Sequence, residues 1–167
     1  MKFPICKVCL KNDILCSGCA EKVKELGIKA DELKMFRRLN KLFKRYDQLK
    51  DVEVKRVIDS KNILLIITNR EDASKLIGKN GGMVKKLGKD LGKQIRVIGE
   101  LSDIGQFVNE IFFSTPILGI NVLYTPEKKK YRIRIPSSER VVLPITPEKF
   151  SDIANSVLNV DAELVFE

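Results

Sequence analysis

The middle of the chain repeats apolar residues every three or four positions, which is the spacing of an amphipathic helix. Residues 31–51 read DELKMFRRLNKLFKRYDQLKD, and Asp31 stands where an N-cap residue is expected. The apolar positions of this predicted helix are Leu33, Phe36, Leu39, Leu42, Phe43, Tyr46 and Leu49. An earlier and shorter helix is predicted over CAEKVKELG, with Gly27 ending it.

Two strands and two short helices are predicted next. Residues 52–59 (VEVKRVID) have interspersed apolar positions, and residues 63–68 (ILLIIT) form a continuous apolar run that is typical of a buried strand. Short helices are predicted from about Glu71 to Leu76 and from about Gly82 to Leu91, with a glycine-bearing loop between them. Gly92 closes the second helix, and the alternating QIRVIGE predicts another strand.

The last third of the chain shows a similar succession of elements. DIGQFVNEIFFS predicts an amphipathic helix, ILGINVLYT and KYRIRI predict a hairpin, TPEKFSDIANSVLN predicts a helix, and AELVFE predicts a strand. Thr146 is the expected N-cap of the latter helix, with Pro147 at its first position. Helices and strands alternate throughout, so we expect an α+β fold in three parts: 1–30, 31–100 and 101–167.

Charge is distributed unevenly over these parts. The 167 residues include 31 Lys and Arg against 22 Asp and Glu, for a formal charge of +9. Residues 31–100 hold eighteen basic and ten acidic residues, whereas residues 101–167 hold seven basic and nine acidic. A surface that binds a polyanion is therefore expected in the middle segment.

The composition also excludes several functions. Without histidine, the chain has no His-based acid–base catalyst, Ser-His-Asp triad or His metal ligand. No paired carboxylates are recognisable, and GKNGG lacks the spacing and the Lys-Ser/Thr ending of a nucleotide-binding loop. We therefore expect neither enzyme activity nor a small-molecule substrate. The most apolar run, Ile63 to Ile67, is far below the ~20 residues that span a bilayer, and lysines interrupt the N-terminus. We expect a cytoplasmic protein without membrane contact.

The four cysteines are Cys6, Cys9, Cys16 and Cys19, in the pattern C-x2-C-x6-C-x2-C. Each pair turns two thiolates toward one point, and two pairs complete a tetrahedral shell that suits Zn²⁺. We expect one structural zinc ion, since four thiolates leave no open position for catalysis. A rubredoxin-like iron site uses the same ligands and stays an alternative. Disulfides are disfavoured because nothing indicates secretion, and a thioredoxin-type pair needs a βαβ setting that is missing. The pattern resembles a small treble-clef or zinc-ribbon module.

A second motif lies in the loop between the two short helices. It reads IGKNGG and comprises Ile77, Gly78, Lys79, Asn80, Gly81 and Gly82. Glycines let the backbone turn sharply and approach a ligand without a Cβ in the way. The loop N–H groups and the positive end of the next helix then face a nucleic-acid phosphate, and Lys79 adds charge. Lys85 and Lys86, just beyond the loop, are also expected to reach phosphates.

IGKNGG between two short helices resembles the GXXG loop of KH RNA-binding domains, which clamps four nucleotides. The order helix, strand, strand, helix, loop, helix, strand over residues 31–100 is similar to the type II KH arrangement. The resemblance implies a groove for bases that is lined by apolar residues of the two short helices and the next strand. Candidates for this lining are Leu76, Ile77, Val84, Leu87 and Val97.

Residues 101–167 resemble a second type II KH unit whose loop is degenerate. The corresponding segment, IPSSERVVLPITPEKF, contains no glycine, and Pro144 and Pro147 stiffen it. Tandem units of this kind resemble the KH region of NusA-family transcription factors, including compact archaeal members. The implied function is binding of single-stranded RNA. This binding would serve transcription elongation or termination, with RNA polymerase as partner, or would take place on the ribosome. The alternative is an adaptor that docks to such a machine through the zinc module and the second unit.

Overall fold

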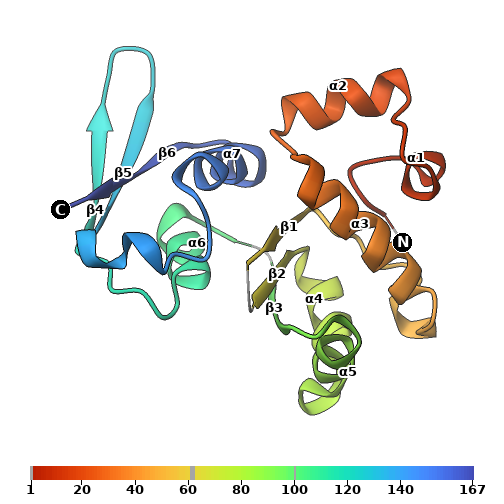
Figure 1. Cartoon of the computed structure of the whole chain (residues 1–167). Coiled ribbons are helices and arrows are strands. Elements are labelled where there is room, and N and C mark those ends of the chain that lie inside the picture. The colour runs from red at the N-terminus through yellow and green to blue at the C-terminus, as the bar shows by residue number, and fades with distance from the viewer. Residues whose placement is uncertain (1, 61–62, 100) are drawn as a thin grey trace. The chain divides into compact units, whose positions relative to one another are not determined.

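The computed structural model describes residues 2–60, 63–99 and 101–167. The chain divides into two units, Met1–Glu100 and Leu101–Glu167. Both units are α+β, and Figure 1 shows helices and a three-stranded mixed sheet in each. Within the described parts of the chain, no helix combines the length and the apolar character needed to cross a membrane.

The first unit places two helices between neighbouring parallel strands. Its elements are α1 (Lys7–Lys11), α2 (Ser17–Glu25), α3 (Ala30–Phe43), the 3-10 turn η1 (Asp47–Leu49), β1 (Arg56–Asp59), β2 (Ile63–Ile67), α4 (Arg70–Ile77), the 3-10 turn η2 (Lys79–Gly81), α5 (Gly82–Leu91) and β3 (Gln94–Ile98). The strand order is β1-β2-β3, with β1 antiparallel and β3 parallel to β2. A parallel pair requires a crossover, which α4, the glycine loop and α5 provide.

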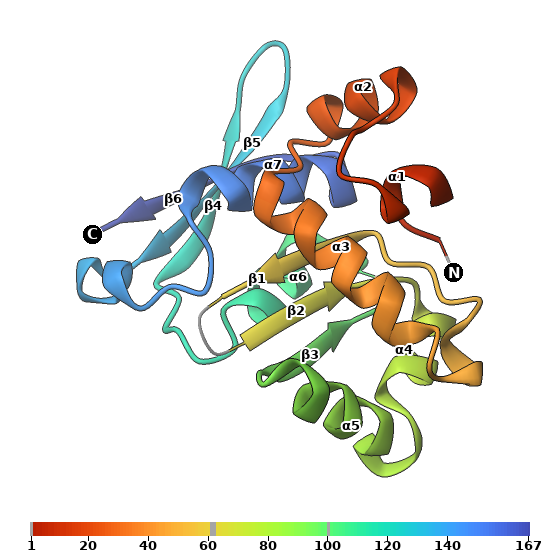
Figure 2. The same ribbon diagram turned by 45° about the vertical axis from the view of Figure 1, so that its right-hand side comes forward.

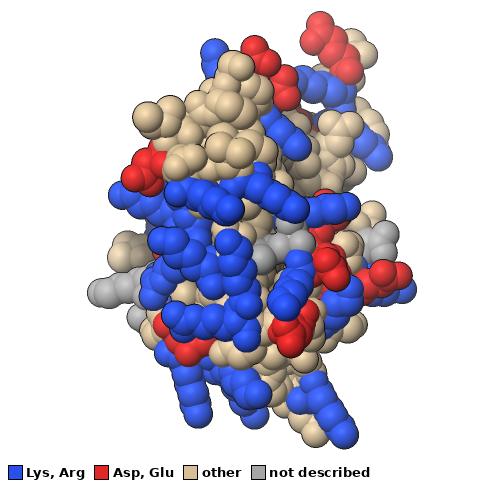
Figure 3. All heavy atoms as spheres, turned by 90° about the vertical axis from the view of Figure 1, so that its right-hand side faces the viewer, with Lys and Arg blue, Asp and Glu red and all other residues tan. Residues whose placement is uncertain are grey.

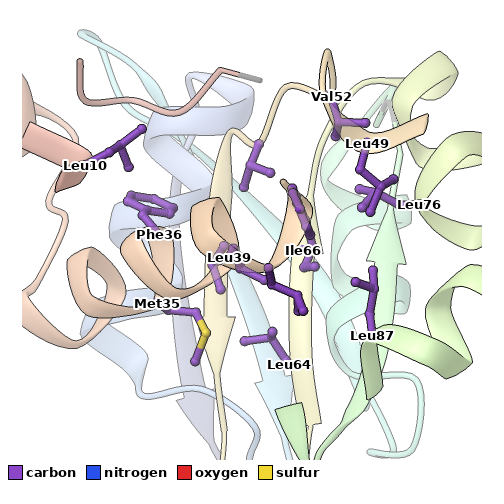
Figure 4. Packing of buried hydrophobic residues seen from close by; sticks show 14 of the residues in the cluster. Leu10, Met35, Phe36, Leu39, Leu49, Val52, Leu64, Ile66, Leu76 and Leu87 are labelled. Carbon is purple, nitrogen blue, oxygen red and sulfur yellow. The ribbon is translucent and has the colours of Figure 1, made fainter. Parts of the chain in front are cut away.

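The core of the first unit lies between this sheet and the helices. Alternate residues of β2, Leu64 and Ile66, belong to the same buried cluster as Leu39 of α3. Figure 4 shows this cluster, which α4 and α5 join through Leu76 and Leu87. Figure 2 shows α3 crossing in front of the strands. The core therefore fixes the glycine loop, because both helices that flank the loop are anchored in it.

The second unit repeats the strand topology of the first. Its elements are α6 (Ile104–Ile111), β4 (Gly119–Tyr124), β5 (Lys129–Ile135), the 3-10 turn η3 (Ser137–Val141), α7 (Pro147–Leu158) and β6 (Asp161–Phe166). The strand order is β4-β5-β6, again antiparallel and then parallel. The rings of Phe107 and Phe112 pack against Phe150 of α7, with centroids 5.6 and 5.5 Å away. Both units thus use a helical crossover between the second and third strands.

Most of the predicted elements are confirmed. The helix from Gly82 to Leu91 has the predicted bounds, and Gly92 closes it with a φ of +66°. The N-cap side chain of Thr146 accepts a hydrogen bond from the Lys149 backbone N–H at 3.3 Å. Glu100, the last residue of the strand predicted over QIRVIGE, lies outside the described residues.

The helix predicted over residues 31–51 is wrong in two respects. α3 ends at Phe43, because Tyr46 is extended with a φ of −119°. Leu49 is expected on the buried face of the helix, and it is buried, but the turn η1 places it there. The N-cap is Lys29 without a side-chain cap, and Asp31 lies in the first turn instead. An acidic residue there is still favoured by the helix dipole.

The strand predicted over residues 52–59 is shorter than expected, and it contains a buried cation. β1 begins at Arg56, which is 2% exposed, and Glu53 forms only an isolated bridge with Lys2. The guanidinium of Arg56 makes two hydrogen bonds of 2.9 Å to the fully buried carboxylate of Glu32. The Val57 backbone N–H donates to the same carboxylate at 2.9 Å. This ion pair joins α3 to the first strand of the sheet.

Candidate functional site

The four cysteines occupy equivalent places at the starts of two helices. Cys6 and Cys16 are the N-caps of α1 and α2, and Cys9 and Cys19 follow three residues later. All four sulfurs lie within 4.8 Å of one another, and these four described residues form no disulfide. The Cys6 backbone N–H donates to Cys19 Sγ at 3.2 Å, and the Cys16 backbone N–H donates to Cys9 Sγ at 3.2 Å. Each pair therefore supplies a backbone donor to the buried sulfur of the other pair.

The surroundings separate the pKa values of the four thiols. The Cys9 backbone N–H lowers the pKa of Cys6 to about 7, and the Cys19 backbone N–H lowers the pKa of Cys16. The Cys6 backbone N–H acts in the same direction on Cys19, but burial and the neighbouring thiols outweigh it and raise the pKa of Cys19 to about 12. Four adjacent thiolates repel one another, so a cation is needed to hold all four without their protons.

A charged side chain from α3 adjoins this cluster. Four thiolates around a divalent ion carry two excess negative charges, which favours a nearby cation. The Arg37 Nε donates to the Cys9 carbonyl oxygen at 3.2 Å, and the Arg37 side chain is only 16% exposed. Its Nη2 is buried without a hydrogen-bond partner among the described residues. The cysteines can hold one metal ion, with Arg37 as an adjacent counter-charge.

The loop between α4 and α5 requires a glycine at its first position. Gly78 has a φ of +72°, and a Cβ built there would lie 2.7 Å from Met83 Cβ and 2.9 Å from Met83 N. Asn80 and Gly81 are also left-handed, with φ values of +54° and +72°. Asn tolerates this conformation better than most residues. The backbone thus reverses within four residues and delivers the chain to the first turn of α5.

The side chains around this loop are accessible to a ligand. The exposed residues among those predicted are Ile77, Lys79, Asn80, Lys85 and Lys86, and Gly78, Gly81 and Gly82 are partly buried. Lys85 and Lys86 have no carboxylate within ion-pair distance in the described parts of the chain. Lys75 differs, because its Nζ lies 3.1 Å from the buried Asp72 carboxylate. The cations that remain available therefore belong to the loop and to α5.

A groove of about 780 Å³ runs beside α5 and reaches the start of β3. Its lining includes Val84, Lys85, Gly88, Lys89, Lys93 and Ile95. Two apolar residues expected in such a groove, Leu76 and Leu87, are instead 0% exposed and belong to the core. Gly88 escaped the sequence analysis, although a glycine inside a helix is a signal. A Cβ at Gly88 would lie 2.9 Å from the Lys93 carbonyl oxygen, so glycine permits the close approach of the chain there.

The corresponding crossover of the second unit has a different shape. Between β5 and α7 the chain forms η3, and residues 136–146 contain no positive φ. Val141 and Val142 are 93% and 67% exposed there, while the Arg140 guanidinium lies 5.1 Å from the Phe166 ring centroid. This crossover therefore presents apolar side chains where the first unit presents backbone and lysines.

Four of the five basic residues of the β4–β5 hairpin form ion pairs within the second unit, and Lys129 lies over the ring of Tyr124. The pairs are Lys128–Asp161, Lys130–Glu163, Arg132–Glu163 and Arg134–Glu167. The parallel register of β5 and β6 places Arg132 opposite Glu163, which explains how one carboxylate serves two cations. These carboxylates reduce the field that the hairpin would offer to a phosphate.

No protein-family model matches the chain, and no curated protein matches it. Among solved structures, one described as the crystal structure of APE1850 is 23% identical to this chain. The match covers 84% of this chain and 100% of that chain, with a TM-score of 0.47.

Proposed function

We propose that this chain binds single-stranded RNA through the loop from Ile77 to Gly82. The observation that carries the proposal is the backbone at Gly78, where both the φ of +72° and the contact with Met83 demand glycine. A phosphate can approach such a turn closely and meet the free N–H groups at the start of α5. The exposed Lys79, Lys85 and Lys86 supply charge around that position.

The architecture of the first unit supports a KH-type role for this loop. The order α3, β1, β2, α4, loop, α5, β3 with a β1-β2-β3 sheet is similar to the type II KH arrangement. The groove beside α5 begins next to the loop, so a strand held at the loop could lay its bases there. The repeated topology of residues 101–167 supports a tandem arrangement like that of NusA-family factors. We therefore propose a role on nascent transcripts with RNA polymerase, or on the ribosome, in the cytoplasm.

We propose that the metal ion is one structural Zn²⁺. Four sulfur donors in two C-x2-C pairs suit zinc, and they leave no open position at which a substrate could bind. Arg37 ties the module to α3, so the ion holds residues of the N-terminus against the RNA-binding unit. Elemental analysis of the purified protein distinguishes zinc from iron.

Replacing Lys79 and Asn80 together by Asp tests RNA binding. The change puts negative charge where phosphates are expected, and Asp tolerates the left-handed conformation of Asn80, so the fold is retained. We expect affinity for a single-stranded RNA to fall by at least about tenfold, since each charge-assisted hydrogen bond contributes about 1.5–3 kcal/mol. Fluorescence anisotropy with a labelled oligonucleotide at fixed salt measures the change.

Ser138→Asp/Arg140→Asp is the matched control for that variant. It makes the same change of charge in the crossover of the second unit, and both of its residues are exposed. We expect it to alter RNA affinity by less than about threefold, because neither residue belongs to the proposed binding loop and salt screens exposed charges. If the two variants bind RNA equally well, the loop does not bind RNA in the proposed way.

A second candidate function, a protein-docking adaptor, is favoured by Val141 and Val142. Their side chains are 93% and 67% exposed, and apolar side chains at a tip are typical of an anchor for another protein. Under this alternative, Val141→Ser/Val142→Ser removes the crosslinked protein partners of the chain in cells but leaves RNA recovery unchanged. Under RNA binding, Lys79→Asp/Asn80→Asp removes the crosslinked RNA. Sequencing that RNA separates ribosomal from nascent transcripts.

A further inference from the structure

A pocket of about 280 Å³ lies between α1 and α3, within the first unit. It is lined by Lys7, Leu10, Lys11, Asn40, Lys44 and Lys50. None of these residues belongs to the glycine loop or to the groove beside α5. The pocket is therefore a separate feature that the proposed RNA site does not use.

Four lysines around one small pocket form an unusual concentration of charge. Lys7, Lys11 and Lys44 have no carboxylate within 4.0 Å in the residues that the structure describes, and only Lys50 has an acidic neighbour, Asp47. Like charges around a pocket repel one another, and an anion bound in the pocket offsets this repulsion. The C-terminal ends of α1 and α3 favour cations and so account for Lys11 and Lys44, but they do not account for Lys7 or for the gathering of four lysines around one pocket.

Asn40 is a second and independent sign that the pocket receives a ligand. Its side chain is 7% exposed, and no described group forms a hydrogen bond with its amide. The amide is not fully enclosed, so solvent or a ligand in the pocket can reach it and supply the missing hydrogen bonds. Arg37, three residues earlier on the same helix, holds α1 in place through the Cys9 carbonyl. The two walls of the pocket are thus fixed relative to each other.

We propose that this pocket binds a phosphate group. Lysines act as point charges for phosphate oxygens, and the amide of Asn40 can donate to them. The lining has no aromatic ring on which a base could stack, so recognition is directed at phosphate. Three more exposed basic residues, Arg38, Lys41 and Arg45, lie on a neighbouring face of α3 and just beyond its end. Figure 3 views the molecule from the side of α1 and α3 and shows Lys and Arg side chains crowded across this face.

The phosphate can come from two sources, a nucleic-acid backbone or a free phosphorylated compound. The basic surface along α3 suits a backbone, because successive phosphates can follow it. The proposal does not rest on the glycine loop. A chain with an inactive loop would still bind phosphate in this pocket, so an experiment can contradict either proposal without contradicting the other.

Two variants of the full, metal-loaded chain test the pocket. Asn40→Leu removes the amide while keeping the number and branching of the side-chain heavy atoms and the net charge, in a helix that tolerates Leu well. Lys11→Gln/Lys44→Gln removes two cations from the lining. The matched control is Lys24→Gln/Lys34→Gln, which removes two exposed lysines from α2 and α3 outside the pocket. Metal content and circular dichroism establish that each variant is folded.

Two probes distinguish the sources of phosphate. Pyrophosphate is titrated while the backbone amide resonances of α1 and α3 are followed by NMR. A 20-base-pair RNA duplex is titrated and followed by fluorescence anisotropy. All variants in this titration also carry Lys79→Asp/Asn80→Asp, which removes the contribution of the glycine loop to RNA binding. We expect pyrophosphate to shift the resonances saturably. We expect the affinity for the duplex to be about tenfold lower in Lys11→Gln/Lys44→Gln than in the control, and several-fold lower in Asn40→Leu than in the control. The slope of log affinity against log salt concentration should decrease in magnitude by about 1–2 in the lysine variant, because fewer phosphate contacts release fewer counterions.

Each outcome decides the proposal. Loss of pyrophosphate and duplex binding in both pocket variants supports a backbone phosphate. Loss of pyrophosphate binding alone supports a free phosphorylated compound. The phosphate pocket is overturned if neither probe binds saturably. It is also overturned if the lysine variant and its control have equal effects and Asn40→Leu binds both probes as tightly as the native chain.

Discussion

Removal of the metal ion is expected to unfold residues 2–28 and to leave residues 101–167 folded. The helices of the module, α1 and α2, have 5 and 9 residues, which is too short for stability in isolation. Structural zinc contributes about 10–16 kcal/mol of apparent binding free energy in small modules, and that free energy stabilises the fold. Without the ion, adjacent thiols must take up protons, and the helix starts lose their common anchor.

Hydrogen exchange measured peptide by peptide, with and without a chelator, tests this expectation. We expect protection over α1 and α2 to be lost, and protection in α3 to fall because Arg37 loses its bond to the Cys9 carbonyl. The second unit is an internal reference that has no cysteine. Cys9→Ser/Cys19→Ser should reproduce the chelated state, with Ser17→Ala as a control in the same segment. A serine variant that retains a full equivalent of metal would contradict the assignment of the ligands.

Local signals were sufficient to predict the glycine loop and its flanking helices. Glycine adopts a positive φ at little cost, and both Gly78 and Gly92 have positive φ values where helices end. Met83, Leu87 and Leu91 form the buried face of α5, so the helical spacing of Leu87 is a better guide than the resemblance that places it in the groove. Steric demand and periodicity act within a few residues, so they can be recognised without the rest of the fold.

Tertiary demands could not be predicted in this way. Tyr46 continues the helical spacing of α3, yet the chain leaves the helix after Phe43 because it must turn back to form the sheet. Asn40 lies among basic residues and carries no sign in the sequence that its amide is buried beside a pocket. A motif fixes its own backbone, whereas a pocket depends on which distant elements meet.

Arg56→Met is expected to destabilise the first unit by about 3–5 kcal/mol, because it leaves the Glu32 carboxylate buried and unpaired. Glu32 is 0% exposed, and in the native chain it accepts two bonds from Arg56 and one from the Val57 backbone N–H. The Arg56 Nη1 also donates to the Leu26 carbonyl at 2.7 Å, so the variant loosens the end of α2 as well.

A second substitution separates the unpaired charge from lost packing. In Glu32→Gln/Arg56→Met the buried side chain is neutral and its amide oxygen still accepts from Val57, so we expect most of the lost stability to return. Arg38→Met makes the same change at an exposed position of α3 and should cost less than about 0.5 kcal/mol. Urea-dependent hydrogen exchange in β2 measures the first unit alone. Equal unfolding free energies for Arg56→Met and Arg38→Met would show that the buried pair does not hold α3 to the sheet.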